Sequence, residues 1–225
     1  MPTTCWPSIR GRAMRITRLN ACGVPVVGLK SVIVSGGFVS VSMSPQYEDG
    51  EQTRKKNAAG ELCVVDPGVP ALAQIDTEIA FCDVNPDIWN VVTGQPLVLD
   101  GDSTAVGIRV GESVQSAWAL EVWTDISGVA CGATPMYGYF LLPFLFNGRL
   151  GDFTIEEAAM DLTLSSSTKR GSGWGVGPYD VVLDALDAPG PLLTAIGPKD
   201  HMHLQATTVA PPTIPADCGA TELAA

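Results

Sequence analysis

The sequence predicts an all-β fold, and three observations lead to that prediction. The chain has 24 glycines and 17 prolines in 225 residues, which favours many turns over long helices. Hydrophobic residues make up 46% and charged residues only 16%, so the chain can build a core. From Met14 onward, short apolar runs alternate with period two between turn residues, which is typical of half-buried strands. We find no repeat or linker and expect one β domain over residues 14–209.

The first predicted elements are strands around a pair of glycines. Gly36-Gly37 separates two alternating runs, residues 32–34 and 39–43, and this pattern predicts a β-hairpin. Residues 1–13 are interpreted as an N-terminal extension or as the result of an upstream start. Basic residues cluster at this end, where they could form a DNA-contacting arm or, more ordinarily, flank a first strand in solvent; they are Arg10, Arg12, Arg15 and Arg18.

A long polar segment follows at residues 44–61. It has mixed charges and no apolar period, and it is too long for a tight turn. The sequence therefore predicts a projecting loop or an extended hairpin, and long ordered loops usually serve a function.

The next predicted strand has one face toward water, and a short helix follows it. Residues 75–81 alternate, with isoleucine, threonine and phenylalanine on one side and Asp76 and Glu78 on the other. Asn85 as N-cap, Pro86 at the first helical position and Gly94 as the stop predict a helix over residues 86–92.

The remaining strands are predicted from the same alternation. They lie at residues 105–110, 118–124, 137–146, 181–183 and 201–209. The apolar parity changes between residues 153 and 160, which predicts a β-bulge near residues 156–159. The Pro-rich tail, residues 210–225, has little reason to pack.

Charge and cysteine usage limit the partners. The chain has 13 basic and 24 acidic residues, a net charge of −11, which repels nucleic acid and anionic membranes on average. Its start lacks the apolar core of a signal peptide, and its longest apolar run, residues 136–146, is too short to span a membrane. Six widely spaced cysteines indicate buried thiols in a reducing cytoplasm, not a zinc site. We therefore expect a soluble, cytoplasmic chain without a membrane partner.

The glycine-rich stretch "TKRGSGWGVGPYDVV", residues 168–182, resembles a phosphate-binding loop but departs from its pattern. Val176 stands where the third glycine of a dinucleotide loop belongs, and the following residues are β-like. We interpret the stretch as a bent surface segment anchored by Trp174 and Tyr179. His201 and His203 could share a strand face and bind a metal, although exposed strand histidines are the simpler interpretation. We predict no enzyme, no catalytic residue, no metal and no cofactor.

Segments along nearly the whole chain resemble one known family. The quoted segments include "RITRLNACGVPVVG", "YEDGEQTRKKNAAGELCV", "PLVLDGDSTAVGIRV", "ALEVWTDISGVAC", "YGYFLLPFLFNGRLGDFTIEEAAMDLTL" and "GPLLTAIGPKDHMHLQATTVAPP". Together with the glycine-rich stretch they are similar to the major tail proteins, or tail tube proteins, of long non-contractile-tailed actinobacteriophages. No single motif among them is chemically diagnostic.

The resemblance implies a fold, an assembly and partners. It implies a β-sandwich or β-barrel-like tail tube fold with one short flanking helix. Copies would close into hexameric rings that stack into a tube in the virion tail, assembled in the host cytoplasm. Partners would be further copies of the chain, the tape measure protein, the tail terminator and distal tail proteins. The genomic DNA would pass through the lumen without specific binding.

Two sets of residues are the predicted assembly sites. Candidate subunit or ring contacts are Tyr47, Glu48, Asp49, Arg54, Lys55, Lys56, Trp174 and Tyr179. The glycines around Trp174 would let that stretch lie close against another backbone, that of a neighbouring subunit. Candidate lumen-facing residues are Asp76 and Glu78, because an acidic wall would let DNA slide without adhering.

Two other classes of protein remain open from the sequence. A ring-forming tail-terminator or baseplate protein would close without stacking. A carbohydrate-binding or hydrolytic β-sandwich would need an exposed aromatic platform, for which the candidates are Trp118, Trp123 and Trp174.

Overall fold

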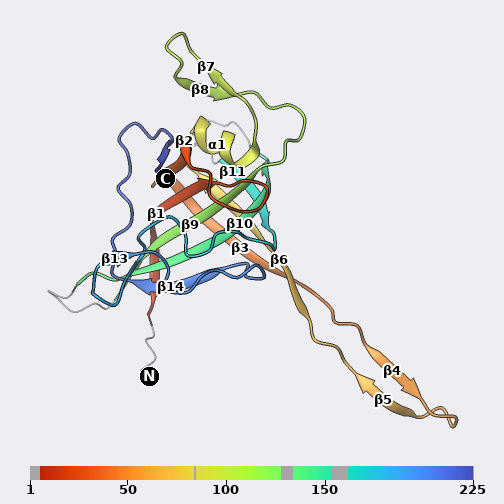
Figure 1. The fold of residues 1–225 in the computed structure, drawn as a ribbon. Coiled ribbons are helices and arrows are strands. Elements are labelled where there is room, and N and C mark those ends of the chain that lie inside the picture. Colours follow the sequence, from red (N-terminus) through yellow and green to blue (C-terminus); the bar gives the residue numbers. More distant parts are fainter. Residues whose placement is uncertain (1–5, 84, 128–133, 154–161, 225) are drawn as a thin grey trace.

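One large antiparallel sheet and one short helix make up the body of the protein (Figure 1). The computed structural model describes residues 6–83, 85–127, 134–153 and 162–224. The strand order in the sheet is β15, β2, β1, β9, β10, β11, β6, β3, and β14 pairs with the first half of β10. The predicted all-β class with one short helix is therefore confirmed at this level. The strands of the sheet are β1 Ser8–Arg18, β2 Gly28–Ser35, β3 Phe38–Glu48, β6 Ala71–Phe81, β9 Ala117–Ile126, β10 Tyr137–Leu150, β11 Leu162–Thr168, β14 His203–Thr207 and β15 Thr221–Leu223.

Three small hairpins lie outside this sheet. The first, which we call the arm, spans residues 49–70 and contains β4 (Thr53–Lys56) and β5 (Leu62–Asp66). The second contains β7 (Leu97–Leu99) and β8 (Ala105–Ile108). The third pairs β12 (Val182–Leu183) with β13 (Pro189–Gly190).

The predicted hairpin at Gly36-Gly37 is wrong. β2 pairs with β1 and β15, whereas β3 pairs with β6 at the other end of the strand order. Two-residue hairpin turns need a positive φ, and neither glycine has one. Both are instead packed closely: a Cβ on Gly37 would lie 2.4 Å from an Asp83 oxygen. Because two residues connect strands from opposite parts of the sheet, the sheet must curl on itself.

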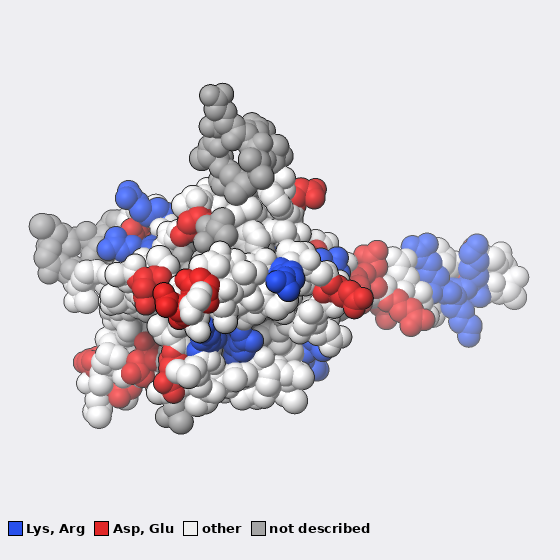
Figure 2. Space-filling view, turned by 90° about the horizontal axis from the view of Figure 1, so that it is seen from above, with Lys and Arg blue, Asp and Glu red and all other residues white. Residues whose placement is uncertain are grey.

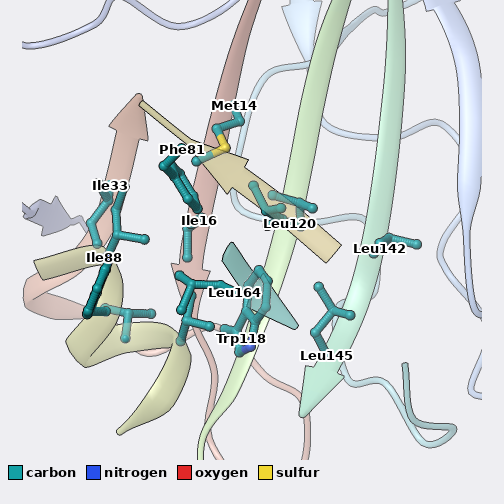
Figure 3. Close-up of a cluster of buried hydrophobic side chains, with 14 of the residues drawn as sticks. Met14, Ile16, Ile33, Phe81, Ile88, Trp118, Leu120, Leu142, Leu145 and Leu164 are labelled. Carbon is teal, nitrogen blue, oxygen red and sulfur yellow. The ribbon is translucent and has the colours of Figure 1, made fainter. Parts of the chain in front are cut away.

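The main core lies on the inner face of the curled sheet (Figure 3). It takes even-numbered side chains from β1 and β9 and odd-numbered ones from β6, as the alternation predicts. Helix α1 (Pro86–Thr93) contributes Ile88, Trp89, Val91 and Val92 to the same cluster.

Helix α1 has the ends that its sequence predicts. The Asn85 side chain accepts hydrogen bonds from the backbone N–H groups of Asp87 and Ile88 at 3.0 and 3.3 Å. Gly94 ends the helix in the left-handed conformation with φ of 73°. The predicted helix over residues 86–92 is confirmed.

Both predicted end segments differ from expectation. Strand β1 begins at Ser8 and pairs with β9, so the predicted extension, residues 1–13, overlaps the sheet. The predicted loose tail ends in β15, where Thr221 pairs with Val32 and the Leu223 side chain is buried. The tail packs because β2 offers a free edge to it. The predicted bulge at residues 156–159 lies outside the described residues.

The outer face of the sheet is divided into two halves. Over β1, β9 and the first half of β10 it is covered by residues 170–200, which we call the cover segment, and a second apolar cluster lies between them. Over β3, β6 and β11 the outer face carries polar side chains and remains uncovered. The cluster under the cover segment consists of Leu19, Ala119, Trp123, Tyr139, Leu141, Phe144, Trp174, Val181, Val182, Leu192 and Ile196.

Candidate assembly surfaces

The arm extends away from the body as a two-stranded ribbon (Figure 1). It continues β3 and β6, whose pairing runs to Glu48 opposite Ala71. The alternative of an extended hairpin, left open for residues 44–61, is thus the correct one, although the ribbon reaches further than predicted. Every residue from 51 to 67 is exposed. The arm therefore gains nothing from burial against its own body.

A pair of glycines forms the neck of the arm. A Cβ on Gly50 would lie 2.5 Å from the backbone nitrogen of Val69, and one on Gly68 would lie 2.6 Å from the Gly50 carbonyl carbon. Gly68 also has φ of 67°, which L-residues rarely adopt. The two backbones touch here because neither residue has a side chain, and this contact fixes where the arm leaves the body.

The arm has basic side chains toward its tip, and apart from Glu61 in the turn its acidic side chains lie toward its base (Figure 2). The predicted contact residues Arg54, Lys55 and Lys56 form most of β4. Tyr47, Glu48 and Asp49 are exposed at the base. The apolar strand β5 was not predicted, and its Leu62, Val64 and Val65 are about half exposed; the run "LCVV" beside the polar segment was the available signal.

The uncovered half of the outer face forms a shallow polar hollow of about 610 Å³. Serines of β3 and β11 flank the two acids of β6 in register: Ser42 and Ser165 pair with Glu78, and Ser44 and Ser167 pair with Asp76. Arg149, opposite Ser165, adds one basic group. Because the serine side chains are short and polar, they leave the hollow open and its surface polar.

The two predicted lumen residues lie on this surface, on the side of β6 that points away from the core. Glu78 is exposed and Asp76 is half-buried, which confirms the predicted water-facing side of the strand. Asp76 accepts hydrogen bonds from Ser167 Oγ at 2.7 Å and from Gln74 Nε2 at 2.8 Å. The carboxylate of Asp76 is held by its neighbours, whereas that of Glu78 is free to meet solvent. A lumen position for them stays a prediction.

The glycine-rich stretch packs against its own chain. Trp174 is only 4% exposed and packs in the cluster under the cover segment, against Tyr179. A Cβ on Gly173 would lie 2.9 Å from the Cys22 carbonyl oxygen, so the close backbone approach is real. Its partner is the turn around Gly23 of the same chain. Trp174 is therefore used within the chain, whereas Tyr179 is half-buried, and the predicted contact role of both residues stays a prediction.

A buried ion pair, missed in the sequence, links β1 to β9, and Tyr179 of the cover segment packs on it. Arg15 donates two hydrogen bonds of 2.6 Å to the Glu121 carboxylate, and Tyr139 donates a third at 2.7 Å. The Tyr179 ring lies over the Arg15 guanidinium at 3.3 Å, and its hydroxyl is 2.9 Å from Thr17 Oγ1. Each charge has a partner, as burial requires. Arg15 is thus unavailable to DNA.

Burial shifts the pKa of the two tyrosines in this network. Burial raises the pKa of Tyr179 to about 12, although the neighbouring Arg15 charge lowers it. Burial, followed by the Glu121 carboxylate, raises the pKa of Tyr139 well above its usual value. Both hydroxyls therefore stay protonated at neutral pH and act as hydrogen-bonding groups.

The two histidines do not form the metal site that was considered. His201 is buried, with Nδ1 2.7 Å from Thr168 Oγ1, and Arg170 Nε donates to its Nε2 at 3.3 Å. His203 Nε2 lies 3.1 Å from Gln205 Oε1. Burial, followed by the Arg170 charge, lowers the pKa of His201. Both ring nitrogens of His201 are occupied, so it is a packed core residue and not the exposed one expected.

The aromatic platform needed for carbohydrate binding is also not formed by the residues considered for it. Trp118 and Trp123 are each 1% exposed, and Trp174 is 4% exposed. Sugar rings stack on exposed aromatic faces, which these three side chains do not offer. This alternative loses its sequence support.

Two further features of the described residues bear on function. Among residues 6–83, 85–127, 134–153 and 162–224, no group of three or more histidine, cysteine or acidic side chains could hold a metal ion. In the same part of the chain no helix is long and apolar enough to cross a membrane.

Comparison with protein-family models and with curated proteins finds no match.

Proposed function

We propose that the protein is the repeating subunit of a phage tail tube, which assembles into stacked hexameric rings. DNA would pass through the lumen of the tube. The resemblance of the quoted segments to tail tube proteins suggests this function, and the large curled sheet with one flanking helix is compatible with it. The tape measure, terminator and distal tail proteins would be its partners in the virion.

The arm is the single observation that carries the proposal. A two-stranded ribbon with three apolar side chains in one strand is marginal in water unless something covers it. Leu62, Val64 and Val65 are exposed in the isolated chain, and exposed apolar clusters mark interaction sites. A neighbouring copy in an assembly would cover them.

The polar hollow supports a channel wall. Phosphate binding requires clustered basic side chains. The hollow instead has serines with Asp76 and Glu78, and Arg149 is its one basic residue among those that line it. DNA would be repelled weakly or left uncontacted here, which suits passage.

Electron microscopy of the purified protein tests the proposal. We expect the wild-type chain to form long hollow tubes at high concentration. A variant with residues 51–67 replaced by Asn-Gly keeps the Gly50 and Gly68 neck and should form no tubes. Separate rings from the wild-type chain would instead indicate a terminator or baseplate protein, and a monomer at every concentration would contradict both.

A further inference from the structure

Two projections leave the body at opposite ends (Figure 1). The arm continues the ends of β3 and β6 at Glu48 and Ala71. The other end of β6, at Phe81, leads to α1, above which the β7–β8 hairpin projects. A surface at each end of one molecule is the arrangement that head-to-tail association needs.

The arm has a basic and apolar tip. Between residues 54 and 65 it has three basic side chains and one acidic one, Glu61. The apolar side chains of β5 lie beside them: Val65 pairs with Arg54, and Val64 pairs with Lys55. A surface that fits this tip should be apolar with acidic groups around it.

The β7–β8 hairpin and the residues after it have that character. Leu99, Val106 and Val110 have exposed fractions of 51%, 58% and 59%. Asp100 and Asp102 lie in the turn and Glu112 follows β8, against one basic residue, Arg109. All four charged residues are exposed. The hairpin is thus the acidic and apolar counterpart of the arm.

We infer that the tip of the arm of one copy docks on the β7–β8 hairpin of the next copy. Apolar contact between β5 and the hairpin would supply the binding energy, and the opposite charges would select the partner and the direction. The arm is about 30 Å long from Glu48 to its turn, at about 3.4 Å per residue, which lets it pass beyond its own body. The inference rests on the proposed function, because it names the contact that stacks the subunits.

The contact repeats without closing on itself. The arm and the hairpin are different surfaces at different ends, so the interface is heterologous. Each copy that donates its arm still offers its own hairpin to another copy. Association through this contact alone therefore extends into a filament.

Charge reversal tests the inference. The first variant is Arg54→Glu/Lys55→Glu/Lys56→Glu, and the second is Asp102→Lys/Glu112→Lys; all five side chains are exposed. We expect each variant to need at least about tenfold more protein than wild type to associate in sedimentation, a shift of about 1.4 kcal/mol. Combining both sets of substitutions in one chain should restore association to within about threefold of wild type.

A matched control separates specific docking from net charge. Asp180→Lys/Asp187→Lys reverses two exposed acids away from the hairpin. Combined with the reversed arm, it should not restore association. The docking would be overturned if this control restored association as well as the hairpin variant does, or if the hairpin variant restored none. Tubes formed by the wild-type chain would still support the proposed function in that case. Head-to-tail oligomers with the expected rescue but without hollow tubes would support the docking and contradict the proposed function. A wild-type chain that stays monomeric would contradict the docking and the proposed function.

Discussion

The arm and the glycine-rich stretch both leave the sheet, but they use their large side chains in opposite ways. In the arm, Leu62, Val64 and Val65 face solvent on a ribbon that touches nothing beyond its base. In the glycine-rich stretch, Trp174 is buried under the cover segment beside Tyr179. The first region can contribute to assembly without affecting the stability of the monomer. The second stabilises the monomer through its buried side chains.

The substitution Trp174→Ala should produce the largest loss of stability. Removing a buried tryptophan leaves a cavity in the cluster under the cover segment, and we expect the free energy of unfolding to fall by about 4 kcal/mol. Urea unfolding measures this. The control Val176→Ala, at an exposed neighbour, should cost less than about 0.5 kcal/mol. If Trp174→Ala abolished tube formation without lowering the free energy of unfolding, the glycine-rich stretch would serve assembly and not the stability of the monomer.

The buried ion pair should show the next largest effect. Arg15→Ala leaves the Glu121 carboxylate buried without its cation, which should cost about 3 kcal/mol. Arg12, with only an exposed 4.0 Å pair to Asp125, is the matched control and should lose less than about 1 kcal/mol as alanine. Thermal or urea unfolding of both variants distinguishes these values. Equal losses would show that the pair does not hold the cover segment.

The substitution Gly173→Ala should cost about 2 kcal/mol, because the new methyl group would overlap Val24 and the Cys22 carbonyl. Gly111→Ala is the control, since nothing lies within 4 Å of a Cβ there. We expect that control to be close to neutral in urea unfolding. A neutral Gly173→Ala would mean that the close approach of the two backbones is not needed.

His201 should make stability depend weakly on pH. Its pKa is lowered in the folded chain, so the unfolded chain binds the extra proton first. Its contribution is complete above the ordinary histidine pKa of about 6.5 and is lost as the pH falls below that value. Unfolding measured between pH 5 and 8 should therefore show a flatter acid side for His201→Gln than for wild type. An unchanged slope would contradict this assignment.

Local patterns predicted the features that depend on local sequence. The alternation in β6 gave the correct faces for Asp76 and Glu78, and Asn85, Pro86 and Gly94 gave the ends of α1. The hairpin prediction failed at Gly36-Gly37, because Gly37 packs against Asp83 and Gly36 against Ile214, and neither forms a turn. Pairing partners far apart in the chain have no local signal.

The candidate site was predicted only where it depends on local sequence. The polar segment was recognisable as a projection, and its basic residues do lie near the tip of the arm. The glycines around Trp174 correctly indicated a close backbone approach. Sequence alone did not show that the approaching backbone is Gly23 of the same chain, since residues 23 and 173 are brought together only by the folded sheet.

Measuring the stability and the assembly of the wild-type chain and of the chain without the arm tests the difference between the two regions most directly. The chain with residues 51–67 replaced by Asn-Gly should keep the wild-type free energy of unfolding within about 0.5 kcal/mol, because exposed residues contribute little to it. In the electron microscope the same preparation should contain no tubes, whereas the wild-type chain should form them. An arm-trimmed chain that polymerises like wild type would contradict the assignment of assembly to the arm.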